Sequence, residues 1–128
     1  MELAATYGSG EPVRIRGIAA RHEIPARFLV QILLQLKAAG LVTSTRGAAG
    51  GYQLAVAPSE LTLGRVMCVV EGQPRDVASC AGSQTAGSRV LVAVWNEAFR
   101  RQRELLDQIT FADLLERARG DEEPMYFI

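Results

Sequence analysis

The sequence of 128 residues contains little cysteine, few aromatic residues and no long apolar run. Its two cysteines, Cys68 and Cys80, are too few for a disulfide framework, so the composition does not indicate a secreted protein. No stretch approaches the roughly 20 apolar residues that a transmembrane helix needs, and no secretory leader opens the chain. The length suits one compact domain with a sizeable core. We therefore expect a cytoplasmic protein that does not contact a membrane.

An excess of charge is also absent, because 14 basic side chains balance 14 acidic ones. The charges are nevertheless unevenly distributed. Residues 11–55 carry six basic and two acidic side chains, whereas residues 56–128 carry eight arginines and eleven acidic side chains. Such a division is typical of a DNA-reading module joined to an assembly module, although chance segregation in a small protein explains the charges equally well.

The pattern of apolar residues and helix breakers predicts a mainly α chain with a small β-hairpin. Helices are expected over 1–6, 14–21, 25–39, 62–71 and 90–107, with a last short helix starting at Thr110. Two short strands, 41–45 and 52–56, flank a glycine-rich tip and form the predicted hairpin. Residues 73–89 are rich in Ser, Ala and Gly and are predicted to be a loop.

Residues 14–39 fit a helix-turn-helix. Ala19 supplies the small residue where the helices cross, and Glu23 occupies the turn position where glycine is commoner. The lone histidine, His22, precedes this turn, where we expect it near a DNA backbone rather than on a metal. An apolar stripe is predicted on the buried side of the second helix: Leu29, Ile32, Leu33 and Leu36.

The opposite side of that second helix carries Arg27 and Gln31, with Val30 beside them. An exposed face of this kind fits the DNA major groove, which is about 12 Å wide. There Arg27 would pair with guanine or a phosphate, and Gln31 with adenine. The alternative is an ordinary amphipathic helix whose polar side is merely solvated.

The hairpin that follows predicts a wing. Arg46 stands at its tip, where a narrow minor groove attracts an arginine, and glycines there let the backbone approach phosphates. A nucleotide phosphate loop is the competing interpretation of Gly47–Gly51. Such a loop opens a helix and carries a lysine followed by Ser or Thr, whereas a strand with Tyr52 follows here.

With these motifs in place, the run PVRIRGIAARHEIPARFLVQILLQLKAAGLVTSTRGAAGGYQLA resembles the DNA-binding half of the Rrf2 family of bacterial winged-helix regulators. The later stretches LTLGRVMCVVEG, VWNEAF and ITFADLLE are similar to the same family, so the resemblance covers nearly the whole chain. It implies a winged helix-turn-helix followed by a long dimerisation helix. The implied division is a DNA-binding region 1–72, a loop 73–89 and a dimerisation region 90–128, within one compact domain.

The resemblance also implies a function. We expect a sequence-specific DNA-binding transcriptional regulator, a homodimeric repressor on a pseudo-palindromic operator, with double-stranded DNA and a second copy as partners. The residues expected to contact DNA are Arg14, Pro25, Arg27, Phe28, Val30, Gln31, Arg46, Gly47, Gly50 and Gly51. No catalytic constellation of Ser/His/Asp, Cys/His or paired carboxylates is present in the pattern, so we do not expect an enzyme.

The sequence departs from the family at three places. About a dozen residues that members carry before the position of Met1 are not present, and Val30 stands where several members have a base-reading glutamate. Cys80 matches the first of three cysteines that hold an iron–sulfur cluster in some relatives, but the other two are missing. We therefore expect no cofactor, with Cys80 as a possible single redox-sensing thiol and Cys68 packed as an apolar residue.

The helix over 90–107 carries one broad apolar side, which we expect to be the dimer interface: Leu91, Val94, Trp95, Ala98 and Leu105. The arginines at 100, 101 and 103 are predicted to form a solvated face with the neighbouring carboxylates. An alternative function from another class is a protein-interaction module that keeps the winged-helix fold and acts through the 73–89 loop or the C-terminal tail.

Overall fold

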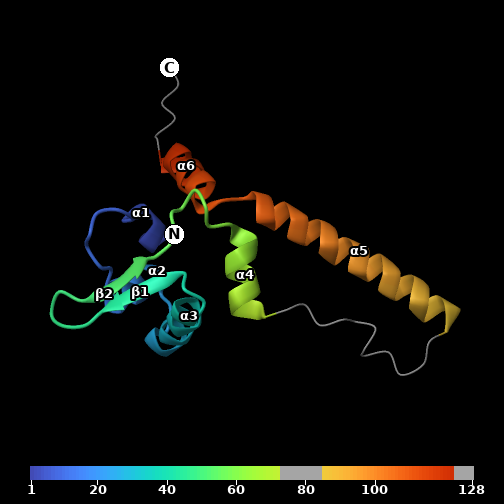
Figure 1. Ribbon diagram of the computed structural model, residues 1–128, viewed down its shortest axis with the longest axis horizontal. Coiled ribbons are helices and arrows are strands. Elements are labelled where there is room, and N and C mark those ends of the chain that lie inside the picture. The colour runs from blue at the N-terminus through green and yellow to red at the C-terminus, as the bar shows by residue number, and fades with distance from the viewer. Residues whose placement is uncertain (73–84, 123–128) are drawn as a thin grey trace, which may run out of the picture.

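The computed structural model describes residues 1–72 and 85–122. Its elements are α1 (Glu2–Ala5), α2 (Ile15–His22), α3 (Ala26–Ala38), β1 (Val42–Thr45), β2 (Gly51–Leu54), α4 (Leu63–Glu71), α5 (Ala86–Gln108) and α6 (Phe111–Glu122). Figure 1 shows α1 to α4 and the hairpin gathered at one end, while the long α5 extends away from them. The prediction of a mainly helical chain with one hairpin is confirmed.

The turn between α2 and α3 is a helix-turn-helix turn. Glu23 has φ 54°, in the left-handed region that glycine adopts most easily, which explains why glycine is commoner at this position. The Ile24 N–H donates to the Ala19 carbonyl at 3.0 Å and fixes the exit of the chain from α2. Pro25 is the N-cap of α3, with φ −56° and ψ 128°, so the helix begins one residue later than predicted.

The end of α3 leads the chain directly into the hairpin. Gly40, with φ 77°, donates to the Lys37 carbonyl at 3.0 Å, and Leu41 donates to the Leu36 carbonyl at 2.9 Å. These two bonds are those of a Schellman motif, which satisfies carbonyls that the helix end leaves open. Leu41 is then buried immediately before β1.

The segment before α2 is bonded to the edge of the hairpin. β1 and β2 pair antiparallel, with Val42 opposite Leu54. Val13 and Tyr52 exchange two backbone hydrogen bonds of 2.8 Å and form an isolated bridge on the outer edge of β2. The start of α2 is therefore attached to the wing.

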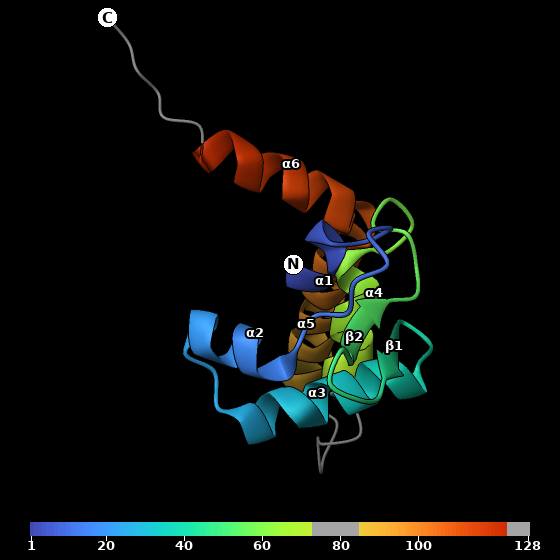
Figure 2. The ribbon, with the colours of Figure 1, turned by 90° about the vertical axis from the view of Figure 1, so that its left-hand side faces the viewer.

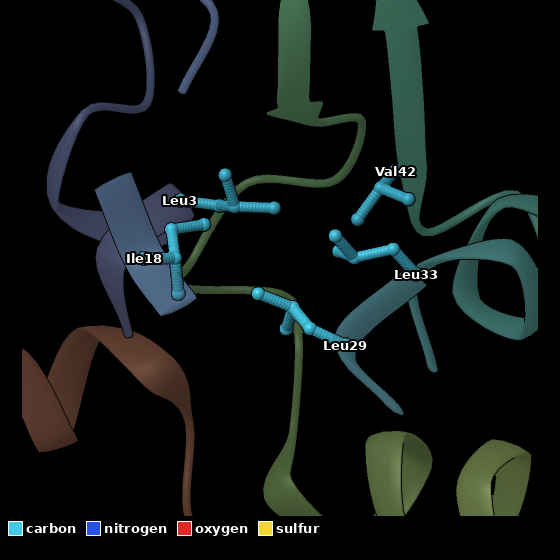
Figure 3. Close-up of a cluster of buried hydrophobic side chains, with 5 residues drawn as sticks. All are labelled: Leu3, Ile18, Leu29, Leu33 and Val42. Carbon is cyan, nitrogen blue, oxygen red and sulfur yellow. The ribbon is translucent and has the colours of Figure 1, made fainter. Parts of the chain in front are cut away.

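The core joins α1, α2, α3 and β1. Its buried side chains converge in Figure 3: Leu3, Ile18, Leu29, Leu33 and Val42. Each contributes roughly 1.5–3 kcal/mol by leaving water. The predicted buried side of α3 is confirmed in Leu29 and Leu33, four residues apart on one face, whereas Ile32 is only half-buried.

The junctions around α4 and α6 depend on threonine caps. Thr62 caps α4, and Thr110 exchanges 3.1 Å hydrogen bonds with Asp113 at the start of α6, which form a capping box. α4 packs closely on α5: a Cβ on Gly64 would lie 2.0 Å from Oδ1 of Asp107 and 3.0 Å from its backbone nitrogen. A side chain at position 64 would displace the Asp107 carboxylate and crowd the backbone of α5.

The predicted loop over 73–89 is too long at its C-terminal end. α5 begins at Ala86, because Thr85 caps it by accepting the Ser88 N–H at 3.1 Å. Glycine and serine at 87–88 have weak helix propensity and concealed this start. The proposed boundary between residues 89 and 90 thus falls inside a helix. Residues 73–84, which include Cys80, and the C-terminal tail 123–128 lie outside the described residues.

Candidate nucleic-acid interface

The outward side of α3 carries most of the predicted base-contacting residues. Arg27 and Gln31 are exposed and lie opposite the buried Leu29, and Pro25 at the N-cap is exposed as well. Phe28 is 56% exposed, an unusually open position for so large an apolar side chain. These four side chains are accessible to a ligand from solvent. Val30 is half-buried, so it offers only part of its side chain.

The wing lies beside α3 and projects beyond it. α3 contacts β1, and the loop between β1 and β2 extends outward at the far end of the molecule from α5 (Figure 1). Arg46 is exposed at the start of this loop. Figure 2 shows α2 and α3 together with the hairpin at one end of the molecule. The helix face and the wing are thus placed to meet one ligand.

Two wing glycines have a structural reason that the sequence interpretation did not identify. A Cβ on Gly50 would lie 2.2 Å from the Thr45 carbonyl oxygen, and one on Gly51 would lie 2.5 Å from the Val13 carbonyl oxygen. Both contacts are with backbone, which cannot move aside without changing the loop. Gly47 has open space around it and φ 105°, which a side chain rarely tolerates. The tight shape of the wing therefore requires these glycines, whatever they contact in a complex.

Arg14, predicted to contact DNA, has a partner inside the protein. Its guanidinium donates to the Ala48 carbonyl at the wing tip, although Arg14 itself is exposed. The side chain thus joins the N-cap position of α2 to the loop that carries Arg46.

A groove of about 560 Å³ lies between the start of α2, the last turn of α3 and the wing. Its lining includes four basic side chains, Arg14, Arg16, Lys37 and Arg46, and no acidic one. Lys37 Nζ donates to Ser44 Oγ at 2.6 Å, which holds the ammonium group at the edge of β1. Sequence reasoning counted Arg16 and Lys37 in the basic half of the chain but did not name them as site residues. Only the fold brings them next to Arg46.

His22 contacts α1. Its Nε2 lies 3.0 Å from Oε1 of Glu2, and Nη1 of Arg21 lies 2.8 Å from the other carboxylate oxygen. The hydrogen bond with His22, and then the neighbouring Arg21, lowers the pKa of Glu2 below its ordinary value. The imidazole is 45% exposed in this pair, and its predicted place near a DNA backbone stays a prediction.

α5 carries an uncovered apolar face, and no residue of this helix is buried. The predicted interface residues Leu91, Val94, Trp95 and Leu105 are between 50% and 65% exposed, and Ala98 is exposed as well. Phe99 extends this face, with its ring centroid 5.5 Å from that of Trp95. We call these six residues the α5 apolar face.

Other sides of α5 are ionic, as predicted. Arg100 pairs with Glu97 and Glu104 at 2.7 and 2.9 Å, and Arg101 pairs with Glu97 at 2.9 Å. Arg103 lies 3.4 Å from Asp107. Hydrogen bonds from Arg100 and Arg101 lower the pKa of the Glu97 carboxyl. The helix is therefore amphipathic: its ionic side is stable in contact with water, whereas exposure of its apolar side to water is unfavourable.

The described part of the chain does not offer the ligands of an iron–sulfur cluster, which normally takes four protein ligands. Cys68 is the free cysteine there, and no three His, Cys, Asp or Glu side chains come together in residues 1–72 and 85–122. Within the same ranges, no helix has both the length and the apolar character needed to cross a membrane.

A recognition helix beside a basic wing is the arrangement of a winged-helix DNA-binding protein. Residues 1–117 match the Rrf2 family model, described as "Iron-dependent Transcriptional regulator". The chain belongs to the Rrf2 family, and it is a DNA-binding transcriptional regulator rather than an enzyme.

Relatives and solved structures agree with this assignment. "Protein rrf2" of Nitratidesulfovibrio vulgaris is 35% identical over 118 residues, which are 89% of this chain and 78% of the relative. "HTH-type transcriptional regulator CymR" of Bacillus subtilis is 32% identical over 127 residues, or 99% of this chain and 88% of the relative. The structure titled "T. potens IscR" matches with a TM-score of 0.78 and 32% identity over 98% of this chain and 83% of its own.

Proposed function

We propose that this protein is a homodimeric repressor that binds a pseudo-palindromic operator. Each subunit inserts the start of α3 into the major groove and the wing into the adjacent minor groove. The observation that carries this proposal is the exposed pair Arg27 and Gln31 on the side of α3 opposite its buried leucines. Arginine pairs with guanine and glutamine with adenine through two hydrogen bonds each, so the pair is suited to reading sequence.

The wing supports the same mode of binding. Arg46 is exposed beside three other basic side chains and no acidic one lines their groove. A narrow minor groove has an enhanced negative potential, which favours an inserted arginine. The backbone around Arg46 is compact because Gly50 and Gly51 pack directly on other backbone atoms.

The α5 apolar face supports a dimer. A contiguous set of large apolar side chains that are about half exposed is costly in water and marks an interface. We propose that a second copy covers it through twofold symmetry, since an isologous contact buries the same face on both subunits and closes the assembly. Two recognition helices related in this way read inverted half-sites.

We infer repression and a cytoplasmic location from the proposed DNA ligand. A dimer seated on promoter DNA excludes RNA polymerase sterically, so we propose repression rather than activation. Bacterial DNA is cytoplasmic, so we place the protein there. We also propose that it works without an iron–sulfur cluster, because Cys68, Cys80 and His22 are the only thiols and imidazole of the sequence. Anaerobic reconstitution with iron and sulfide should then give no bound iron and no stoichiometric charge-transfer band.

Operator selection tests the proposal as a whole. The full chain, purified, is used to enrich binding sites from random duplex DNA, and the enriched sequences are aligned. We expect an inverted repeat whose half-sites lie about one helical turn, or a multiple of it, apart. Transcription in vitro from a promoter that overlaps this site should fall as protein is added. Enrichment of no site, or of a single site without a repeat, would reject the proposal.

A further inference from the structure

The groove between the start of α2, the last turn of α3 and the wing has a chemistry of its own. Four cationic side chains line it and no carboxylate does, so it presents a net charge of four positive units from its lining residues. In a groove open to water these charges repel one another, which costs stability unless an anion lies between them. The arrangement is therefore suited to an anionic ligand.

The individual groups in the groove are suited to phosphate oxygens. The Lys37 ammonium has three N–H bonds and donates to the Ser44 hydroxyl at 2.6 Å, which fixes its position while leaving two N–H bonds for a ligand. Arg16 stands in the first turn of α2, whose start has no side-chain cap, so the positive end of the helix dipole adds to the charge of Arg16. Arg14 is occupied with the Ala48 carbonyl and orients the wall of the groove.

The groove is also continuous with the wing. Arg46 and Gly47 belong both to its lining and to the wing tip. A DNA duplex that receives Arg46 in its minor groove presents the flanking backbone within reach of this lining, because phosphates border the groove on both sides. Acidic side chains, which would hold the hydroxyl groups of a free nucleotide, are not among the lining residues.

We propose that this groove seats phosphate groups of the operator backbone that flank the minor-groove contact of Arg46. Arg16 and Lys37 bind the phosphates, and Arg14 positions the wing against them. The inference rests on the proposed function and adds to it a sequence-independent anchor. The anchor sets the register of the wing on the duplex and carries no information about base sequence.

Charge-neutral variants test the anchor. Arg16→Gln and Lys37→Gln are compared with wild type and with Arg119→Gln, a matched loss of one exposed positive charge on α6. Each groove variant should weaken binding about fivefold to tenfold at 0.1 M salt, on the selected operator and on a scrambled duplex alike. Each should also reduce the slope of log K against log salt by about 0.9, whereas Arg119→Gln leaves affinity and slope near wild type. Unchanged thermal unfolding midpoints show that the variants fold.

A phosphate scan locates the ligand. Single neutral methylphosphonate groups are placed along one half-site of the operator. The scan identifies the phosphate, next to the minor-groove contact, whose neutralisation weakens binding of the wild-type protein. The same substitution should have little further effect on Arg16→Gln or Lys37→Gln, because the contact is already lost. Additive losses at every position would overturn the inference.

Two other results separate the inference from the proposed function. If wild type prefers its operator while both groove variants keep wild-type affinity and salt slope, the anchor is wrong and the proposed function stands. If wild type prefers no operator, the proposed function itself fails. Saturable micromolar binding of ATP or inorganic phosphate without DNA, abolished by Arg16→Gln, would show that the groove is a pocket for a free anion and would overturn the inference.

Discussion

The guanidinium of Arg14 donates a hydrogen bond to the main-chain carbonyl of Ala48, which is 34 residues away in the sequence. Arg14 is the N-cap residue of α2, and Ala48 lies at the tip of the wing. The neighbouring Val13 pairs with Tyr52 through two backbone hydrogen bonds of 2.8 Å. Through these contacts the wing is held at a defined place relative to the helix-turn-helix.

Removal of the Arg14 side chain should loosen the wing more than it destabilises the fold. In Arg14→Ala the Ala48 carbonyl loses its partner, but both groups are exposed and water replaces the bond, so the free energy of unfolding should fall by no more than about 1 kcal/mol. Amide hydrogen exchange at residues 47–50 should become faster, and affinity for any duplex should fall. Arg16→Ala is the control, because it should weaken DNA binding without changing exchange in the wing. Equal exchange rates in wild type and Arg14→Ala would contradict this role.

Gly50→Ala should disrupt the wing by steric conflict. The added Cβ would lie 2.2 Å from the Thr45 carbonyl oxygen and 2.9 Å from the carbonyl carbon of Arg46, so backbone must shift. We expect a loss of about 1–3 kcal/mol in the free energy of unfolding and weaker DNA binding. Gly120→Ala is a matched control, since its Cβ meets nothing within 4 Å in a helix, and it should stabilise by up to about 1 kcal/mol. Urea titration of both variants measures the difference. A Gly50→Ala protein as stable as wild type would show that the loop has room for a methyl group.

Local signals account for most of what the sequence predicts correctly. Gly40 ends α3 and Thr62 begins α4 because caps act within a few residues, and the αL conformation of Glu23 follows from the spacing of the helix-turn-helix. The same local approach missed Thr85 as the start of α5, since glycine and serine follow it. Periodicity also gave the right buried face of α3, but it did not distinguish the buried Leu33 from the half-buried Ile32.

The site depends on contacts that no local pattern contains. The attachment of Arg14 to Ala48 and the meeting of Arg16, Lys37 and Arg46 in one groove arise only when the hairpin folds back beside the start of α2. His22 pairs with Glu2, 20 residues earlier, for the same reason. A residue list from sequence therefore identified the exposed side of α3 and the wing, but it did not identify which cations share a surface.

Arg46 and Arg27 should fail in different ways as DNA-contacting residues. Arg46→Ala should weaken binding to all duplexes and reduce the salt slope by about one unit, because a minor-groove and phosphate contact is lost. Arg27→Ala and Gln31→Ala should instead relax the preference at one or two base pairs per half-site, by roughly 1–3 kcal/mol each. Binding of each variant to the selected operator and to single-base variants across a salt series distinguishes these outcomes. If neither arginine changes binding, the assignment of α3 and the wing is wrong.

Acid should weaken the contact between α1 and α2. Hydrogen bonds from His22 and Arg21 lower the pKa of Glu2 in the folded protein, so the unfolded state takes up this proton first as pH falls. The contribution of the carboxylate is therefore complete above the ordinary value of 4.5 and is lost as pH falls through the lower folded value. Thermal unfolding should show Glu2→Gln to be less stable than wild type at pH 7, by up to about 1 kcal/mol in the free energy of unfolding. This difference should disappear as pH falls below the lowered pKa of Glu2. Glu60→Gln, at an exposed carboxylate, is the control, and a gap that widens in acid would contradict the sign.

A single charge in the α5 apolar face should separate the subunits. Wild type is expected to be a dimer at tens of micromolar, because Leu91, Val94 and Trp95 are each at least half exposed in the isolated chain and gain by mutual burial. Trp95→Glu removes the largest of these side chains and places a carboxylate where a twofold contact would desolvate it, so the variant should sediment as a monomer. Glu104→Gln changes charge by one unit on the ionic side of the helix and should remain dimeric.

The monomeric Trp95→Glu variant should also lose most of its operator affinity, because one half-site contact replaces two. A wild-type monomer at tens of micromolar would reject the dimer, and a Trp95→Glu dimer would show that this face is not where the subunits meet.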